Sequence, residues 1–93
     1  MEDIKILLGN RIRFLRTQMD LSQEELALKA GLDRTYVTSI ENGKRNVSIV
    51  NIERLATALE HSLSDFFDAK EFHRLPTYTT LSKVAEKGAK RYK

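Results

Sequence analysis

Apolar positions along this chain recur at helical spacing. One stripe with the 3.6-residue period predicts a first helix of about four turns, and it consists of Ile4, Leu8, Ile12, Leu15 and Met19. A second stripe follows a capping residue, Ser48, and would face the core through Ile49, Ile52, Leu55, Ala56 and Leu59. Strand-like alternation of apolar and polar residues is absent from the sequence. We therefore expect an all-α fold, a compact five-helix bundle around one core.

Two short helical segments between these stripes carry their own start and stop signals. Ser22 and Glu25 have the spacing of a capping box, and Asp33 is a typical N-cap. Gly31 and Gly43 lie just past the two segments, where a left-handed residue can end a helix. So short a turn forces the two helices to cross. The sequence thus predicts a helix-turn-helix motif at residues 23–42, with its second helix at 34–42.

The carboxyl-terminal part of the chain predicts a fifth helix and then a tail. Ser64 with Asp65 would cap a helix that begins Asp65-Phe66-Phe67 and stops before Pro76. We expect a domain at residues 1–75 and a basic tail at residues 76–93 that is flexible or weakly helical.

The motif resembles a known family at many spaced positions. These include the glutamine that opens the first motif helix, the small residue within it, the turn glycine, the two buried positions of the second helix and an Ile-Glu-Asn-Gly exit: Gln23, Ala27, Gly31, Val37, Ile40 and residues 40–43. Over residues 9–67 the chain resembles the Xre-like transcriptional regulators, the family of phage repressor and Cro proteins. Residues 32–36 and 44–46 look most like the controller proteins of restriction-modification systems. The resemblance implies a fold of the phage-repressor DNA-binding type.

Charge is divided unevenly along the chain. Residues 1–68 carry nine Lys/Arg and eleven Asp/Glu, a net charge of −2, whereas residues 69–93 carry a net charge of +5. A DNA-binding function therefore requires clustered cations in the first part. One candidate cluster lies on the second motif helix and just after it, and another on the first helix: Arg34, Lys44 and Arg45, then Arg11, Arg13 and Arg16.

The second motif helix predicts how bases would be read. With Val37 and Ile40 turned inward, the outer face offers base-reading candidates, which are Arg34, Thr35, Tyr36, Thr38 and Ser39. Arg34 suits guanine O6 and N7, and Thr35 suits thymine, whereas the last three could also contact the backbone. Phosphate contacts are expected from Gln23, Asn42, Lys44, Arg45 and Asn46. For Gln23 the resemblance implies the same role. Glu41 is expected to cap or bridge locally.

One such helix covers only a few base pairs, so we expect a homodimer on a palindromic operator. The fifth helix offers more apolar area than a small core needs, and its interface candidates are Leu63, Phe66, Phe67 and Phe72. Two alternatives stay open. The chain could be an antitoxin that uses residues 69–93 to cover a toxin, or a helical protein-interaction module that never reads bases.

Other functions find little support in the composition. The 93 residues include no cysteine, which excludes disulfides and thiolate metal sites and fits a reducing cytoplasm. His61 and His73 lack further ligands at metal spacing, so we expect surface histidines, no metal and no cofactor. No nucleophile, base and orienting group stand at plausible spacing, so we expect no enzyme. Neither a signal peptide nor an apolar membrane span is expected.

Overall fold

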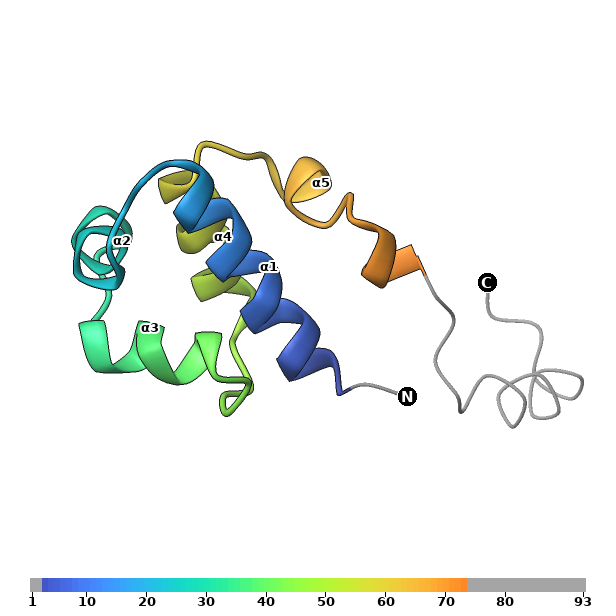
Figure 1. The fold of residues 1–93 in the computed structure, drawn as a ribbon, viewed down its shortest axis with the longest axis horizontal. Coiled ribbons are helices and arrows are strands. Elements are labelled where there is room, and N and C mark those ends of the chain that lie inside the picture. Colours follow the sequence, from blue (N-terminus) through green and yellow to red (C-terminus); the bar gives the residue numbers. More distant parts are fainter. Residues whose placement is uncertain (1–2, 74–93) are drawn as a thin grey trace, which may run out of the picture.

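A computed structural model describes residues 3–73 of the chain. The helices are α1 (Ile4–Gln18), α2 (Gln23–Ala30), α3 (Arg34–Glu41), α4 (Ile49–Ala58) and α5 (Leu63–Phe66), followed by a 3₁₀ turn at Lys70–His73 (Figure 1). Over this range no strand is present, so the predicted all-α class with five helices is confirmed. The predicted domain boundary after residue 75 and the tail at 76–93 lie outside the described residues.

The predicted caps set the bounds of the motif helices. The Ser22 side chain accepts from the Glu25 N–H while the Glu25 carboxylate accepts from the Ser22 N–H, which completes the capping box. Asp33 accepts from the Thr35 N–H at 3.1 Å and so begins α3. Gly31 has a φ of 70°, the left-handed conformation that a residue without a Cβ adopts at little cost. This turn lets α2 and α3 meet at a sharp angle.

The fifth helix begins earlier and is shorter than the sequence suggested. Its cap is Ser62, whose side chain accepts from the Asp65 N–H at 3.1 Å, rather than Ser64 with Asp65. The helix begins at Leu63 and ends at Phe66, far before Pro76. Ser62 and Ser64 could each cap the start of this helix. Ser62 is the cap because a helix that begins at Leu63 places Phe66 in the core, where it is 0% exposed.

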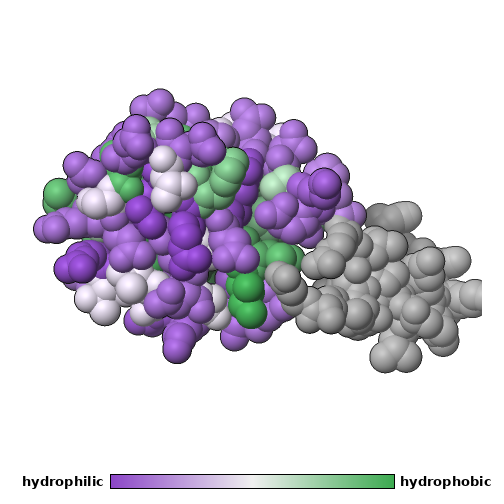
Figure 2. Space-filling model, viewed as in Figure 1, coloured by the Kyte–Doolittle hydropathy of each residue, from purple (hydrophilic) through white to green (hydrophobic). Residues whose placement is uncertain are grey.

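The core forms where α1, α2, α3 and α4 converge, with Phe66 of α5 closing it. Most of the predicted inward positions are buried, and the core consists of Leu8, Ile12, Leu15, Leu26, Ala27, Ala30, Val37, Ile40, Leu55, Ala56, Ala58, Leu59 and Phe66. One predicted core residue is wrong, since Ile49 is 62% exposed, and Ile4 in the stripe of the first helix is also exposed, at 60%. Each occupies the first position of its helix, beyond the neighbouring elements that would cover it. Figure 2 shows hydrophobic surface beside the start of α1.

α1 passes unusually close to the end of α3. A Cβ at Gly9 would overlap the carbonyl oxygen of Ile40 and lie 2.8 Å from that of Glu41. Only glycine fits at this crossing, because the obstructing atoms belong to the backbone and cannot rotate away. α3 therefore packs against both α1 and α2, and α2 in turn packs on α4 (Figure 1). This arrangement fixes α3 by its inner face and leaves the opposite face outward.

Candidate DNA interface

α3 separates a buried face from an outward one, as the sequence predicted. Val37 is 0% and Ile40 1% exposed, whereas Arg34 and Thr35 are exposed at the amino end of the helix. The other three base-reading candidates, Tyr36, Thr38 and Ser39, are half-buried along the sides. An outward amino end is the part of such a helix that meets base edges in a major groove. Among residues 3–73, therefore, no protein layer covers Arg34 and Thr35.

The segment that follows α3 extends this outward surface with cations. Asn42 is the C-cap, and Gly43 with a φ of 74° turns the chain out of the helix. The next three residues are exposed, as is Asn42 itself: Lys44, Arg45 and Asn46. Arg45 also folds back, so that its guanidinium lies 5.2 Å from the ring centroid of Tyr36. The predicted phosphate-contacting residues after the helix thus lie next to the predicted reading residues.

Gln23, the first predicted phosphate contact, belongs to a network of side-chain hydrogen bonds. Gln23 donates from Nε2 to Glu41 Oε1 at 3.0 Å and accepts at Oε1 from the Thr38 hydroxyl at 2.7 Å. Thr38 also lies 3.1 Å from the Arg34 carbonyl oxygen, to which its hydroxyl can donate instead. Gln23 therefore ties the start of α2 to the outward part of α3, and its contact with phosphate stays a prediction.

Glu41 is the centre of this network. Of the residues in it, Glu41 is the one whose structural role was hardest to predict from the sequence. Its side chain is fully buried, and Arg16 donates to it twice, from Nε at 2.6 Å and from Nη2 at 2.9 Å. Arg13 Nε lies 3.5 Å from Oε1, and its Nη2 donates to the Glu41 carbonyl oxygen at 3.1 Å. Glu41 does form a bridge, but the expectation that it would be local is wrong, because its contacts join α3 to α1 and α2.

Electrostatics of the network favour both charged forms. Burial desolvates Glu41 and would raise the pKa of its carboxyl, but hydrogen bonds from Arg16 and Gln23 and the charges of Arg16 and Arg13 outweigh it, so the pKa is lowered. The hydrogen bond to Glu41 raises the pKa of Arg16 against the opposing effect of burial. The pair therefore stays ionised at neutral pH.

These contacts correct the predicted charge cluster on the first helix. Arg16 and Arg13 form ion pairs with the Glu41 carboxylate. Arg11 donates to the carbonyl oxygens of Phe66 at 2.7 Å and Asp65 at 3.0 Å. All three guanidinium groups bind the protein itself, because charged or carbonyl oxygens lie within their reach. The exposed cations of the predicted interface are then those of α3 and the segment after it, Arg34, Lys44 and Arg45.

The predicted dimer surface divides into core and surface parts. Phe66 is 0% exposed, so it belongs to the monomer core, and its place among the interface residues is corrected. Leu63, Phe67 and Phe72 are half-buried. The Phe67 ring packs edge-on against Phe66, with centroids 5.0 Å apart, and against Phe72 at 5.1 Å. Phe67 and Phe72 therefore continue the core outward to an accessible edge.

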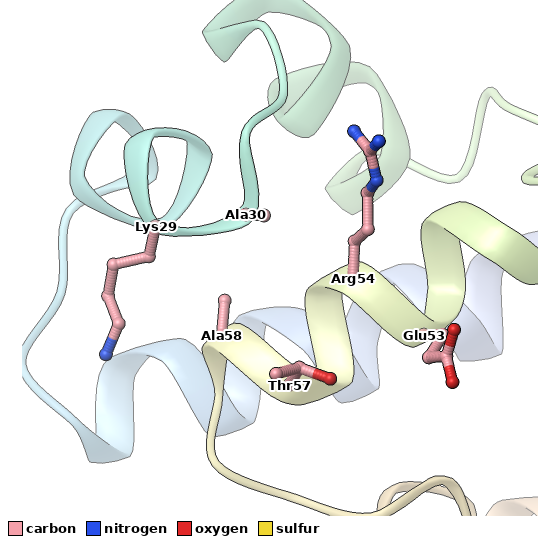
Figure 3. A pocket seen from close by; sticks show the side chains of 6 residues that line it. All are labelled: Lys29, Ala30, Glu53, Arg54, Thr57 and Ala58. Carbon is pink, nitrogen blue, oxygen red and sulfur yellow. The ribbon is translucent and has the colours of Figure 1, made fainter.

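A shallow pocket between α2 and α4 offers no second site. Its lining residues are Lys29, Ala30, Glu53, Arg54, Thr57 and Ala58 (Figure 3). The two cationic side chains extend in opposite directions in Figure 3, Lys29 toward an ion pair with Glu60 at 3.7 Å and Arg54 toward the Gly31 carbonyl oxygen at 3.4 Å. They do not converge on a ligand, so the pocket is a packing gap between helices.

Residues 3–73 contain neither a candidate metal site nor a candidate membrane span. No group of three or more His, Cys, Asp or Glu side chains is placed to hold a metal ion there. None of the helices in this range has the length and apolar character needed to span a bilayer. His73 is exposed as expected, whereas His61 is half-buried with Nδ1 2.8 Å from the Leu59 carbonyl oxygen.

Comparison with known proteins places this geometry in a family. The family model described as helix-turn-helix matches residues 12–66. The chain is 54% identical over 68 residues to control protein C.MunI of Mycoplasma sp. The matched region makes up 72% of this chain and 92% of that protein. It is 42% identical over 67 residues to control protein C.BamHI of Bacillus amyloliquefaciens, which covers 71% and 83% of the two chains.

Solved structures agree with this assignment. The restriction-modification controller protein C.AhdI from Aeromonas hydrophila has a TM-score of 0.65 and 52% identity, over 68% of this chain and 96% of that one. The C.Esp1396I tetramer in complex with its natural 35-base-pair operator has a TM-score of 0.69 and 34% identity, over 73% and 90% of the chains. The chain therefore belongs to the helix-turn-helix family of DNA-binding transcriptional regulators, in which its similar relatives are restriction-modification controller proteins.

Proposed function

We propose that this protein is a controller of restriction-modification genes that binds a palindromic operator as a homodimer. The observation that carries the proposal is the exposed amino end of α3, where Arg34 and Thr35 lie opposite the buried Val37 and Ile40. The relative C.Esp1396I occurs as a tetramer on its operator, which supports double-stranded operator DNA as the partner here. We further infer that the protein is not an enzyme and that it acts in the cytoplasm, where it would meet operator DNA.

Selection of bound sequences from a random duplex pool tests this function directly. We expect one inverted repeat to be enriched, with its half-sites about 34 Å apart, or a multiple of that, because a two-fold dimer places its two recognition helices at that spacing. A circular dichroism spectrum of the same sample should show that the protein is helical. A folded protein that enriches no sequence over the starting pool would remove the proposal.

Within this function we divide the site into reading and gripping residues. Arg34→Ala should lose about 1–3 kcal/mol of binding free energy and relax the preference at one operator position, since Arg34 would form the bidentate contact. Arg45→Ala should weaken binding to all sequences alike and reduce the slope of log affinity against log salt by about one unit. Lys29→Ala removes a cation from the α2 and α4 side and is the matched control. Equal effects of the first two substitutions would contradict the division.

The dimer is expected to form through the edge that Leu63, Phe67 and Phe72 provide. Phe72→Ser should raise the dimer dissociation constant measured by sedimentation, because Phe72 adds apolar area outside the core cluster. Leu28→Ser is the matched control, since Leu28 is 76% exposed on α2. A wild-type protein that stays monomeric at micromolar concentration, free and on its operator, would contradict the dimer.

A further inference from the structure

A hydrogen bond connects α4 to α3 at the edge of the candidate interface. Asn51 Nδ2 donates to the Tyr36 hydroxyl oxygen at 3.1 Å, across 15 positions of sequence. Asn51 lies in the first turn of α4, where its own N–H donates to the Ser48 side chain at 3.1 Å. The helix cap therefore fixes the position of Asn51, and both partners of the contact are half-buried.

The direction of this bond decides what the tyrosine can still do. A phenol offers one proton to donate and oxygen lone pairs to accept. Because the Asn51 amide occupies a lone pair, the hydroxyl proton is not needed for this contact. Across residues 3–73, the Tyr36 hydroxyl is found donating to no protein group. It can donate to an acceptor outside the protein, such as a phosphate oxygen or the acceptor edge of a base.

The same tyrosine also supports a cation. The Arg45 guanidinium lies 5.2 Å from the centre of the Tyr36 ring, within the range of a cation–π interaction. The ring is thus held at its hydroxyl end by Asn51 and covered by Arg45. Side chains that are ordered before binding lose less conformational freedom when a partner arrives. Asn51 consequently orders two candidate DNA contacts, neither of which is its own.

We propose that Asn51 is a positioning residue for operator recognition, which holds Tyr36 so that its hydroxyl proton and the overlying Arg45 are directed toward the DNA. The inference rests on the proposed function and adds a residue to it. The competing account is that the bond serves only to pack α4 on α3. Packing alone would alter the melting temperature but not the affinity of protein that remains folded.

A double-mutant cycle separates the two accounts. The variants are Tyr36→Phe, Asn51→Ala and the pair together, and their affinities are measured by fluorescence anisotropy on the duplex that wild-type protein selects. Each single substitution should weaken binding about 3- to 10-fold, the effect of one hydrogen bond. The double variant should bind within about 2-fold of Tyr36→Phe alone, because an amide with no hydroxyl to hold has no further effect.

Thermal melts show whether each variant is folded at the assay temperature, and Asn10→Ala on the exposed surface of α1 is the matched control. Losses that multiply in the double variant would overturn the proposal, since Asn51 would then act without Tyr36. An Asn51→Ala protein that binds as wild type would overturn it as well. Failure of the proposed function looks different: wild-type protein itself would select no duplex.

Discussion

Replacement of Glu41 by alanine would test whether one buried carboxylate holds the motif together. The substitution removes the acceptor of two hydrogen bonds from Arg16 and one from Gln23. It leaves the backbone carbonyl that Arg13 contacts in place. α1, α2 and α3 would then lose their shared polar contact, and the Arg16 guanidinium would remain in a site that was built for an ion pair.

The expected loss follows from the burial of the two partners. Removing one member of a buried ion pair costs about 3–5 kcal/mol, because the remaining charge is left uncompensated. Arg16 retains 13% exposure of its side chain and also donates to the Leu21 carbonyl oxygen at 2.8 Å, so we expect about 3 kcal/mol, the lower end. A domain of this size has about 5–10 kcal/mol of total stability, so the variant should stay folded with about 2–7 kcal/mol remaining.

Urea unfolding at pH 7, followed by helical circular dichroism, measures this loss. Arg16→Met and the double variant complete a cycle, in which we expect at least about 1 kcal/mol of coupling because the residues touch. Lys29→Ala breaks an exposed ion pair with Glu60 and should cost less than about 1 kcal/mol. If Glu41→Ala cost no more than this control, the buried pair would not have the importance assigned to it.

Three further predictions concern the same framework. Gly9→Ala should cost about 1–3 kcal/mol in thermal melts, since its Cβ would overlap backbone oxygens of α3, and an unchanged melt would contradict this close approach. The lowered pKa of Glu41 means that its carboxylate stabilises the fold above about pH 4.3, the ordinary pKa of an unfolded glutamate, and that this contribution disappears as the pH falls through the folded pKa. Stability between pH 7 and pH 2 should therefore fall less in Glu41→Gln than in wild type, and equal falls would disprove it. Arg11→Ala should speed hydrogen exchange of the α5 amides, because two carbonyl contacts at the end of that helix are lost; unaltered exchange would mean that α5 does not depend on Arg11.

Local signals in the sequence were enough to predict where the helices of the motif begin and end. Ser22, Asp33 and Gly31 act on atoms within four residues of themselves, so their effect can be predicted without a tertiary structure. The inward positions Val37 and Ile40 follow from helical spacing for the same reason. Periodicity failed at Ile4 and Ile49, because a pattern gives the face of a residue but not whether a neighbouring element reaches the end of the helix.

Only the tertiary structure decided how the charged side chains are used. Nothing near Arg16 in the sequence identifies Glu41, 25 positions away, as its partner, and composition alone made three arginines of α1 equally available to DNA. The same holds for Asn51, whose effect on Tyr36 depends on α4 lying beside α3. The sequence therefore determined where each helix begins and which side of α3 turns outward. The fold determined which arginines bind protein groups, because electrostatic and hydrogen-bonded partners are set by distance in space.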